Sequence, residues 1–248
     1  MKKRKIVIGN WKMNVFSEKE AKKLVSDVKK KTSNVKNTDI VFCVNQVFLP
    51  SLSKLKSKNY SIGVQNIASN EKGSFTGETS VFHIKPFGVK YSIIGHSERR
   101  KMGESDKAIN EKIKISLNNG IFPIVCIGED LRDEHGQYLD FIKKQIKDAF
   151  LGVNKNQILD IIIAYEPIWA VGAPKPASPE DVFEMYLWIK KCLKEIVGSL
   201  SENIRIVYGG AVDEGNASQI MKIGNIDGFL VGRSSLDPKA FSEIIKNI

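Results

Sequence analysis

Eight short apolar runs recur along the chain, and each is followed by a segment of helical pattern. The runs are Ile6–Gly9, Ile40–Val44, Tyr60–Val64, Tyr91–Gly95, Ile121–Ile127, Ile161–Ala164, Ile204–Tyr208 and Gly228–Val231. The helical segments are Ser17–Lys31, Val47–Ser57, Ser80–Phe87, Ser105–Asn119, Asp133–Leu151, Pro179–Val197, Glu214–Lys222 and Pro238–Lys246. One apolar run together with the helical segment that follows it occupies about 31 residues, the size of one strand–helix unit. Eight parallel strands close into a barrel, so we expect residues 1–248 to form a single (β/α)8 barrel domain.

Local signals support this division of the chain. Ser17 precedes a run rich in lysine and glutamate, and Glu20 follows three residues later, as in a capping box at a helix N-terminus. Ser178 offers a second cap, with Pro179 at the first helical position. The chain lacks the GxGxxG turn that is typical of doubly wound nucleotide-binding sheets, so the barrel is the favoured fold.

Composition argues against several other classes of protein. The apolar runs are too short to cross a membrane, and the segment after the basic Met1–Lys5 is too short for a signal peptide. The formal charge of +10 comes from lysines spread over helical segments, which indicates a solvated surface rather than a nucleic-acid partner. His83 and His135 have no ligand spacing, so we expect no metal or cofactor. Three cysteines without CxxC spacing predict reduced core thiols in a cytoplasmic protein: Cys43, Cys126 and Cys192.

The segment Ile161–Gly172 (IIIAYEPIWAVG) carries the first candidate for catalysis. Four apolar residues lead through Tyr165 to Glu166, and Pro167 follows. Proline cannot donate to a strand ladder, so we expect the strand to end there with the carboxylate at its mouth. A carboxylate at the end of a buried strand is poorly placed for stability and well placed for acid–base chemistry.

Other polar residues follow the predicted strands at the same end of the barrel, where barrel enzymes bind their substrates. They are Asn10 and Lys12 after the first strand, His96 and Glu98 after the fourth, Glu129 after the fifth, Glu166 after the sixth, Gly209, Gly210 and Ala211 after the seventh, and Gly232 and Arg233 after the eighth. One mouth therefore collects carboxylates, an imidazole, an amine and glycine-containing turns.

These residue types fit the movement of a carbonyl group along a short carbon chain. A carboxylate such as Glu166 removes a proton from the carbon beside the carbonyl and returns it to the neighbouring carbon. The enediolate between these steps carries negative charge on oxygen, which requires fixed donors such as His96, Asn10 and Lys12. Backbone amides in the last glycine turns would hold a phosphate ester, and a lid would exclude water.

Seven motifs along the chain resemble the triose-phosphate isomerase family. They are GNWKMN (9–14), GSFTGE (73–78), IIGHSERR (93–100), PIVCIGE (123–129), AYEPIWAVG (164–172), YGG (208–210) and DGFLVG (227–232). The resemblance covers essentially the whole chain. It implies a TIM barrel that interconverts dihydroxyacetone phosphate and D-glyceraldehyde 3-phosphate, in glycolysis and gluconeogenesis. It also implies that Glu166 is the base and His96 the neutral electrophile, while Lys12 and Asn10 stabilise the enediolate and bind substrate.

The resemblance implies further residues around the site. Glu98 and Glu129 would support it, and Glu129 would accept the indole N–H of Trp169 when the lid is open. The loop that carries Thr76 would enter the active site of a second subunit, which implies a homodimer. The expected substrate-binding residues of the lid and of the last two turns are Gly172, Gly210, Ala211, Gly232 and Arg233.

The departures from the family pattern cluster around the expected phosphate site. The lid tip Gly172–Ala177 (GAPKPA) contains two prolines, which fix the backbone and remove two amides. Ala211 stands where the family usually has a serine, and Arg233 stands where a second glycine is common. Arg233 either covers the phosphate with a forked pair of hydrogen bonds or faces solvent.

The sequence alone leaves three functions open. Isomerisation of triose phosphates is favoured, because the other motifs of that family are complete. An isomerase of a four-carbon ketose phosphate, such as erythrulose phosphate, would keep the proton-transfer residues and differ around the phosphate. The third function, of another class, is a catalytically silent barrel that binds anionic polymers through its positive surface.

Overall fold

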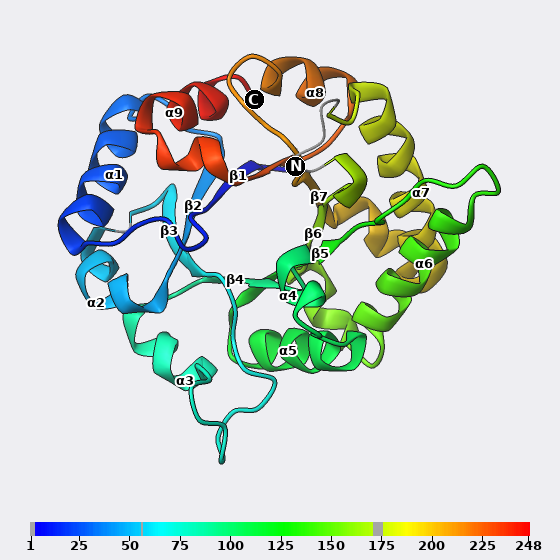
Figure 1. Ribbon diagram of the computed structural model, residues 1–248, viewed down its shortest axis with the longest axis horizontal. Helices are drawn as coiled ribbons and strands as arrows, with labels where there is room; N and C mark the ends of the chain where they lie inside the picture. Colours follow the sequence, from blue (N-terminus) through cyan, green and yellow to red (C-terminus); the bar gives the residue numbers. More distant parts are fainter. Residues whose placement is uncertain (1–2, 56, 171–175) are drawn as a thin grey trace.

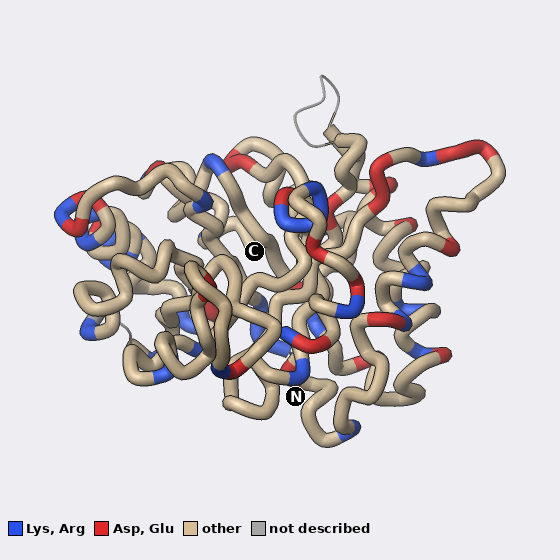
Figure 2. Tube along the Cα trace, turned by 60° about the horizontal axis from the view of Figure 1, so that its bottom comes forward, with Lys and Arg blue, Asp and Glu red and all other residues tan. Residues whose placement is uncertain are grey.

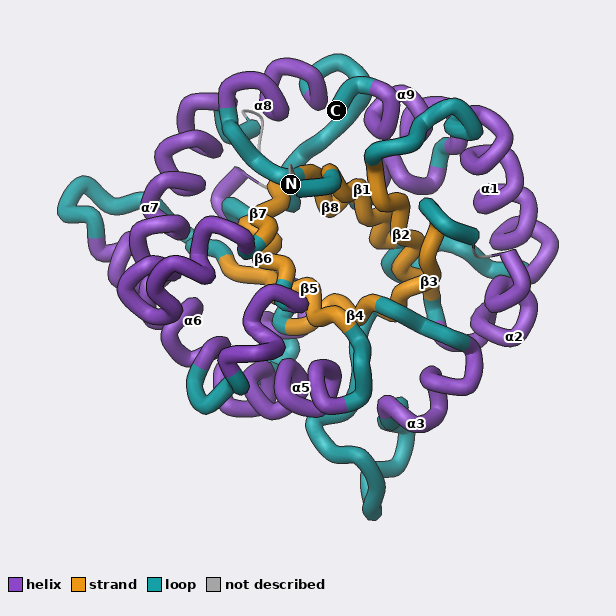
Figure 3. Tube along the Cα trace, turned by 180° about the vertical axis from the view of Figure 1, so that it is seen from behind, coloured by secondary structure: helices purple, strands orange, loops and turns teal. Residues whose placement is uncertain are grey.

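Eight parallel strands form a closed barrel in the computed structural model, which describes residues 3–55, 57–170 and 176–248. Strand order follows chain order, and β8 pairs with β1 to close the barrel. The strands are β1 (Lys5–Asn10), β2 (Thr38–Val44), β3 (Tyr60–Val64), β4 (Tyr91–Ile94), β5 (Phe122–Ile127), β6 (Ile162–Tyr165), β7 (Arg205–Tyr208) and β8 (Gly228–Val231). Figure 3 shows them as a central ring surrounded by helices. The predicted (β/α)8 fold is confirmed, and every predicted strand is present with bounds close to those expected.

Helices connect the strands and cover the outside of the barrel (Figure 1). The α-helices are α1 (Glu18–Lys31), α2 (Leu49–Leu52), α3 (Val81–Ile84), α4 (Ser97–Lys101), α5 (Asp106–Asn118), α6 (Gln137–Phe150), α7 (Pro179–Val197), α8 (Ala217–Ile223) and α9 (Pro238–Lys246). Short 3-10 helices are η1 (Gln46–Phe48), η2 (Ser53–Leu55), η3 (Lys85–Phe87), η4 (Lys155–Asp160), η5 (Ile168–Ala170), η6 (Gly198–Asn203) and η7 (Arg233–Leu236).

The two predicted helix starts are present, one of them in altered form. At α7 the Ser178 hydroxyl accepts the amide hydrogen of Asp181 at 3.1 Å, and the Asp181 carboxylate accepts that of Ser178 at 2.8 Å. At α1 the Ser17 hydroxyl accepts the amide hydrogen of Glu20 at 3.2 Å. The Glu20 carboxylate, however, accepts the amide hydrogen of Phe16 instead of that of Ser17. The second half of this capping box is therefore displaced by one residue.

The helix expected from Asp133 starts later, at Gln137. The Asp133 carboxylate accepts the amide hydrogens of His135, Gln137 and Tyr138, which fold the chain into a turn. Gly136 has a left-handed φ of 74°, which glycine adopts without steric cost. This side-chain bonding competes with the helix at its expected first turn.

The helices expected over Val47–Ser57 and Ser80–Phe87 are broken into short α and 3-10 turns. Pro50 and Pro86 each lie near the start of one of these turns and provide no amide hydrogen, so a continuous ladder cannot run through them. Helix α4 was not expected from the pattern. It is a single short turn that follows β4 directly, with His96 as its N-cap.

Alternation along the strands divides the core in two. Ile6 and Ile8 point into the barrel with residues of the other strands, whereas Val7 between them packs outward against the helices. All three cysteines are buried and unpaired, and Cys43 and Cys126 belong to the inner cluster. Two separate apolar layers therefore hold the strand ends in fixed positions around the mouth of the barrel.

Charged residues are distributed over the outside of the molecule, with Lys and Arg interspersed among Asp and Glu (Figure 2). Helix α1 has such a mixed surface, where Lys22 pairs with Glu18 and Lys23 with Asp27. Over the described part of the chain, no helix is long and apolar enough to cross a membrane.

Candidate active site

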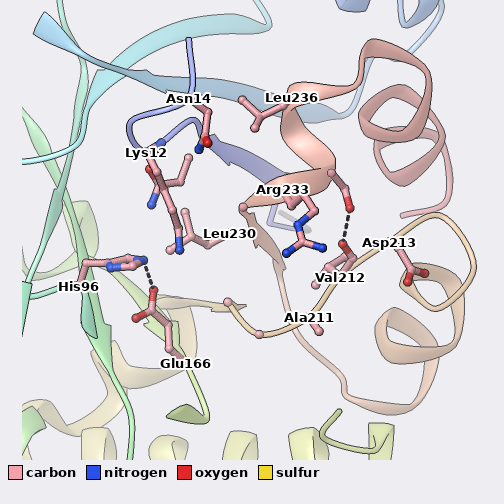
Figure 4. A pocket seen from close by; sticks show the side chains of 15 residues that line it. Lys12, Asn14, His96, Glu166, Ala211, Val212, Asp213, Leu230, Arg233 and Leu236 are labelled. Carbon is pink, nitrogen blue, oxygen red and sulfur yellow. Dashed lines mark hydrogen bonds and ion pairs between the residues drawn. The ribbon is translucent and has the colours of Figure 1, made fainter. Parts of the chain in front are cut away.

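A cavity of about 570 Å³ lies at the carboxyl ends of the strands. Its walls include all four predicted catalytic residues and four of the predicted substrate-binding residues: Asn10, Lys12, His96 and Glu166, with Gly210, Ala211, Gly232 and Arg233. Gly172 lies outside the described residues. In Figure 4, Lys12, His96 and Glu166 face one side of the cavity, whereas Ala211 and Arg233 lie on the other.

Glu166 occupies the position directly after β6 and is only 3 % exposed. Its backbone amide donates to the carbonyl of Ile127 at 2.8 Å, which fixes the turn at the strand end. One carboxylate oxygen, Oε2, accepts the amide hydrogen of Ser97 at 3.2 Å. The other oxygen, Oε1, is buried and accepts no hydrogen bond from the residues that the structure describes. One oxygen of the carboxylate is therefore held by a hydrogen bond, and the other oxygen can still accept one.

Two glycines make room for Glu166. A Cβ on Gly128 would lie 1.8 Å from the Glu166 carbonyl oxygen, and a Cβ on Gly209 would lie 2.9 Å from its Cγ. Both distances are shorter than van der Waals contact, so only glycine allows the backbone and side chain of Glu166 to lie here. Gly128 after β5 and Gly209 after β7 thus leave the space that the Glu166 backbone and side chain occupy.

His96 presents one defined ring nitrogen to Glu166. Its Nδ1 accepts the amide hydrogen of Glu98 at 3.2 Å, so Nδ1 carries no hydrogen and the ring is neutral with its proton on Nε2. Nε2 lies 3.4 Å from Oε1 of Glu166. This contact is longer than a normal charge-assisted hydrogen bond. The Nε2–H group can therefore donate a hydrogen bond to a substrate oxygen.

Lys12 and Asn10 follow β1 on a strained turn. Lys12 has a left-handed φ of 50°, which is uncommon for a residue with a side chain and often marks functional sites. Its amide donates to Oδ1 of Asn10 at 3.1 Å, and its carbonyl accepts from Nε2 of Gln65 at 2.8 Å. These bonds on both sides of Lys12 hold the turn in this conformation.

The Lys12 ammonium is paired with Glu98, at 2.6 Å between Nζ and Oε1. Partial burial would raise the pKa of Glu98, but the hydrogen bond and charge of Lys12 outweigh it, so this pKa is lower than usual. Glu98 therefore stays ionised and holds the ammonium at the cavity wall. An anionic substrate has to compete with Glu98 for Lys12.

Glu129 follows β5, next to the strand that leads to Glu166, and is 1 % exposed. Its Oε1 accepts hydrogen bonds from the Tyr165 hydroxyl and from the Trp169 indole, both at 2.8 Å. The Glu129–Trp169 contact expected from the family is therefore present. Arg132 also donates to Oε1, at 3.2 Å, although no sequence pattern pointed to this residue. Burial and the adjacent Glu129 charge raise the pKa of Tyr165, so its hydroxyl remains a donor.

Two other buried groups near Glu166 remain in their neutral forms. Burial, followed by the negative charge of Glu166, raises the pKa of Cys126 well above its usual value. Burial also raises the pKa of Tyr208, whose hydroxyl has no hydrogen-bond partner among the described residues. These features agree with the interpretation of Cys126 as a packing residue rather than a nucleophile.

The opposite wall of the cavity has the properties of an anion site. The amides of Gly210 and Ala211 donate to no acceptor in the described part of the chain. Arg233 is exposed at the start of η7, and its guanidinium makes no ion pair or hydrogen bond with the described residues. Lys12 is paired with Glu98, whereas Arg233 offers an uncommitted positive charge on this wall.

Thr76 is not part of this cavity. It lies on an exposed loop between β3 and α3 that projects away from the barrel (Figure 1). Phe75 on this loop is 47 % exposed, and Met102, which lines the same surface hollow, is 77 % exposed. Met13, which follows β1, is 82 % exposed. Across residues 3–55, 57–170 and 176–248, no group of three His, Cys, Asp or Glu residues is arranged to hold a metal ion.

Comparison with known proteins agrees with this arrangement. The family model described as triosephosphate isomerase matches residues 5–248. A triosephosphate isomerase of Alkaliphilus oremlandii is 42 % identical over 243 residues, 97 % of this chain and 98 % of the relative. Proteins with the same name from Acetivibrio thermocellus and Endomicrobium trichonymphae are 41 % and 38 % identical, over 99 % and 97 % of both chains.

Proposed function

The chain belongs to the triosephosphate isomerase family, and we propose that Glu166 is the base with which it interconverts dihydroxyacetone phosphate and D-glyceraldehyde 3-phosphate. The observation that carries this proposal is the 3.4 Å approach of a neutral imidazole to a buried carboxylate at the mouth of the barrel. The two alternatives, a four-carbon isomerase and a silent anion-binding barrel, have no support over this function. The reaction belongs to glycolysis and gluconeogenesis.

Glu166 takes the proton from the carbon beside the carbonyl, and the electron pair of that C–H bond forms the double bond of the enediolate. The carbonyl oxygen then carries the negative charge, and Nε2–H of His96 donates to it. The hydroxyl proton on the carbon that Glu166 deprotonated then moves, by way of Nε2 of His96, to the former carbonyl oxygen. Glu166 returns its own proton to the former carbonyl carbon, and the oxygen that lost its hydrogen becomes the new carbonyl, which completes the isomerisation without any cofactor. The Lys12 ammonium and the Asn10 amide stabilise the enediolate from the side of β1.

The phosphate group binds at the opposite wall in this proposal. The amides of Gly210 and Ala211 and the turn at Gly232 surround it, and Arg233 adds a charged side chain. Gly172 belongs to the same proposed set on the basis of the family resemblance alone. Glu98 and Glu129 support the site, the first through Lys12 and the second through Trp169.

We also propose that residues 1–248 act as one domain in a cytoplasmic homodimer. Three unpaired cysteines fit a reducing compartment. The projecting loop leaves Thr76 and the apolar Phe75 exposed, which favours insertion into a second copy of the chain.

Hydrogen exchange during turnover tests the proposed reaction. Purified protein in D2O, given dihydroxyacetone phosphate, should form D-glyceraldehyde 3-phosphate that carries solvent deuterium on carbon 2. The product and its isotope content are measured by NMR. Absence of both product formation and deuterium incorporation would refute the function.

A further inference from the structure

Arg132 lies between β5 and α6, and its guanidinium contacts residues on both sides of the base in the sequence. Nη2 lies 3.3 Å from the hydroxyl of Tyr165, the residue before Glu166. The guanidinium carbon lies 5.0 Å from the centre of the Trp169 ring, three residues after Glu166. This distance is within the range of a cation–π interaction.

The same guanidinium reaches the start of α7. Nη1 donates to Oδ1 of Asp181 at 2.9 Å and lies 3.4 Å from Oε2 of Glu184. The other Asp181 oxygen, Oδ2, closes the capping box with Ser178. Arg132 thus joins the chain that leads into Glu166 to the first turn of the helix that follows residues 171–175.

These contacts converge on a buried charge. Oε1 of Glu129 accepts hydrogen bonds from Tyr165, Trp169 and Arg132. Oε2 of Glu129 is buried and has no hydrogen-bond partner within the described part of the chain. Burial alone would lower the pKa of Arg132, but the adjacent Tyr165 and Glu129 raise it above its usual value, so the cation persists. A lysine could supply one point charge here, but it could not reach Glu129, Asp181 and Tyr165 in one plane.

We propose that Arg132 is a positioning residue for the isomerisation, because it fixes the segments on both sides of Glu166 through Tyr165, Trp169 and Asp181. The inference rests on the proposed function of Glu166. Arg132 itself is absent from the residues that line the catalytic cavity, so it acts on the base and not on the substrate. Its removal should lower the rate of proton transfer more than it weakens substrate binding.

The experiment compares Arg132→Met and Arg132→Lys with a matched control, Lys143→Met. Lys143 also joins α6 to α7, through an ion pair with Glu195 at 2.6 Å, but it contacts no residue beside the base. For Arg132→Met we expect kcat to fall about tenfold or more, with KM for dihydroxyacetone phosphate changed by less than about twofold. Arg132→Lys should recover only part of kcat, and Lys143→Met should equal the unaltered protein.

A double variant identifies the route of the effect. The double variant carries Trp169→Phe together with Arg132→Met. If Arg132 acts through the indole, the fold loss of kcat in the double variant should be smaller than the product of the fold losses in the two single variants. Unchanged kcat in Arg132→Met, or full recovery with lysine, would overturn the inference. Should Arg132→Met fail to fold, Arg132→Lys decides by the same measurements. Lack of triose phosphate turnover by the unaltered protein would refute the proposed function instead.

Discussion

Nε2 of His96 lies 3.4 Å from Oε1 of Glu166, although the two residues follow different strands, β4 and β6. The imidazole is oriented by its other nitrogen, which accepts the amide hydrogen of Glu98. The carboxylate is oriented by Ser97, the residue that follows His96. The first turn of α4 therefore positions both side chains, and the proposed base and the proposed donor are fixed relative to each other in the structure without substrate.

Replacement of Glu166 by glutamine should lower kcat by about two to four orders of magnitude, because the amide cannot accept a proton from carbon. Glutamine has nearly the same shape and its carbonyl oxygen can still accept from Ser97, so thermal unfolding should change little. Steady-state rates and melting temperatures of Glu166→Gln check this. Glu166→Asp should also lose orders of magnitude in rate, since the carboxylate is one methylene shorter. Normal turnover in the glutamine variant would exclude Glu166 as the base.

The sequence predicted Glu166 and His96 because their positions depend on strand ends, which apolar runs and proline define. It did not predict Arg132, since its partners are far apart in the chain and the sequence shows neither the turn around Asp133 nor the approach of α7. The break in the helix expected from Asp133 has the same origin: one carboxylate binds three local amides. Short-range hydrogen bonding of this kind leaves no periodic pattern.

Gly209→Ala should impair catalysis more than stability. The added methyl group would lie 2.9 Å from Cγ of Glu166, so the Glu166 side chain has to move while the strands remain in place. We expect kcat to fall about tenfold to a hundredfold, because small displacements of a reacting group have effects of this size. Rate measurements and urea unfolding of the same preparation separate the two effects. Equal losses in rate and in folded fraction would show that the glycine serves the fold alone.

Arg233→Ala should weaken phosphate binding. A charge-assisted hydrogen bond on an exposed wall corresponds to about tenfold in affinity, so the inhibition constant of inorganic phosphate should rise by about that factor. Lys239→Ala removes an exposed cation nearby on α9 that does not line the cavity, and serves as the control for general charge loss. If both variants bind phosphate as the unaltered protein does, Arg233 faces solvent.

Phe75→Asp should dissociate the proposed homodimer. Phe75 is 47 % exposed beside Thr76 on the projecting loop, and burial of a carboxylate against a second subunit is costly without a partner. Sedimentation velocity should show the mass of one chain for the variant and of two for the unaltered protein. Turnover should fall with dissociation if Thr76 completes the neighbouring site. Sedimentation of the unaltered protein as a monomer at all concentrations would contradict the proposed dimer.

Lys190 should make stability depend on alkaline pH. Burial, reinforced by the nearby Lys3, lowers the pKa of Lys190 from 10.5 to about 8, and its Nζ lies 2.7 Å from the carbonyl oxygen of Ser201. Between these two values the unfolded chain binds a proton that the folded chain has released, so this group adds stability as pH rises from about 8 to 10.5. Urea unfolding at several pH values gives the free energy of unfolding as a function of pH. Between about pH 8 and 10.5 this free energy should rise more steeply with pH for the unaltered protein than for Lys190→Met. Parallel slopes would show that Lys190 keeps an ordinary pKa in the fold.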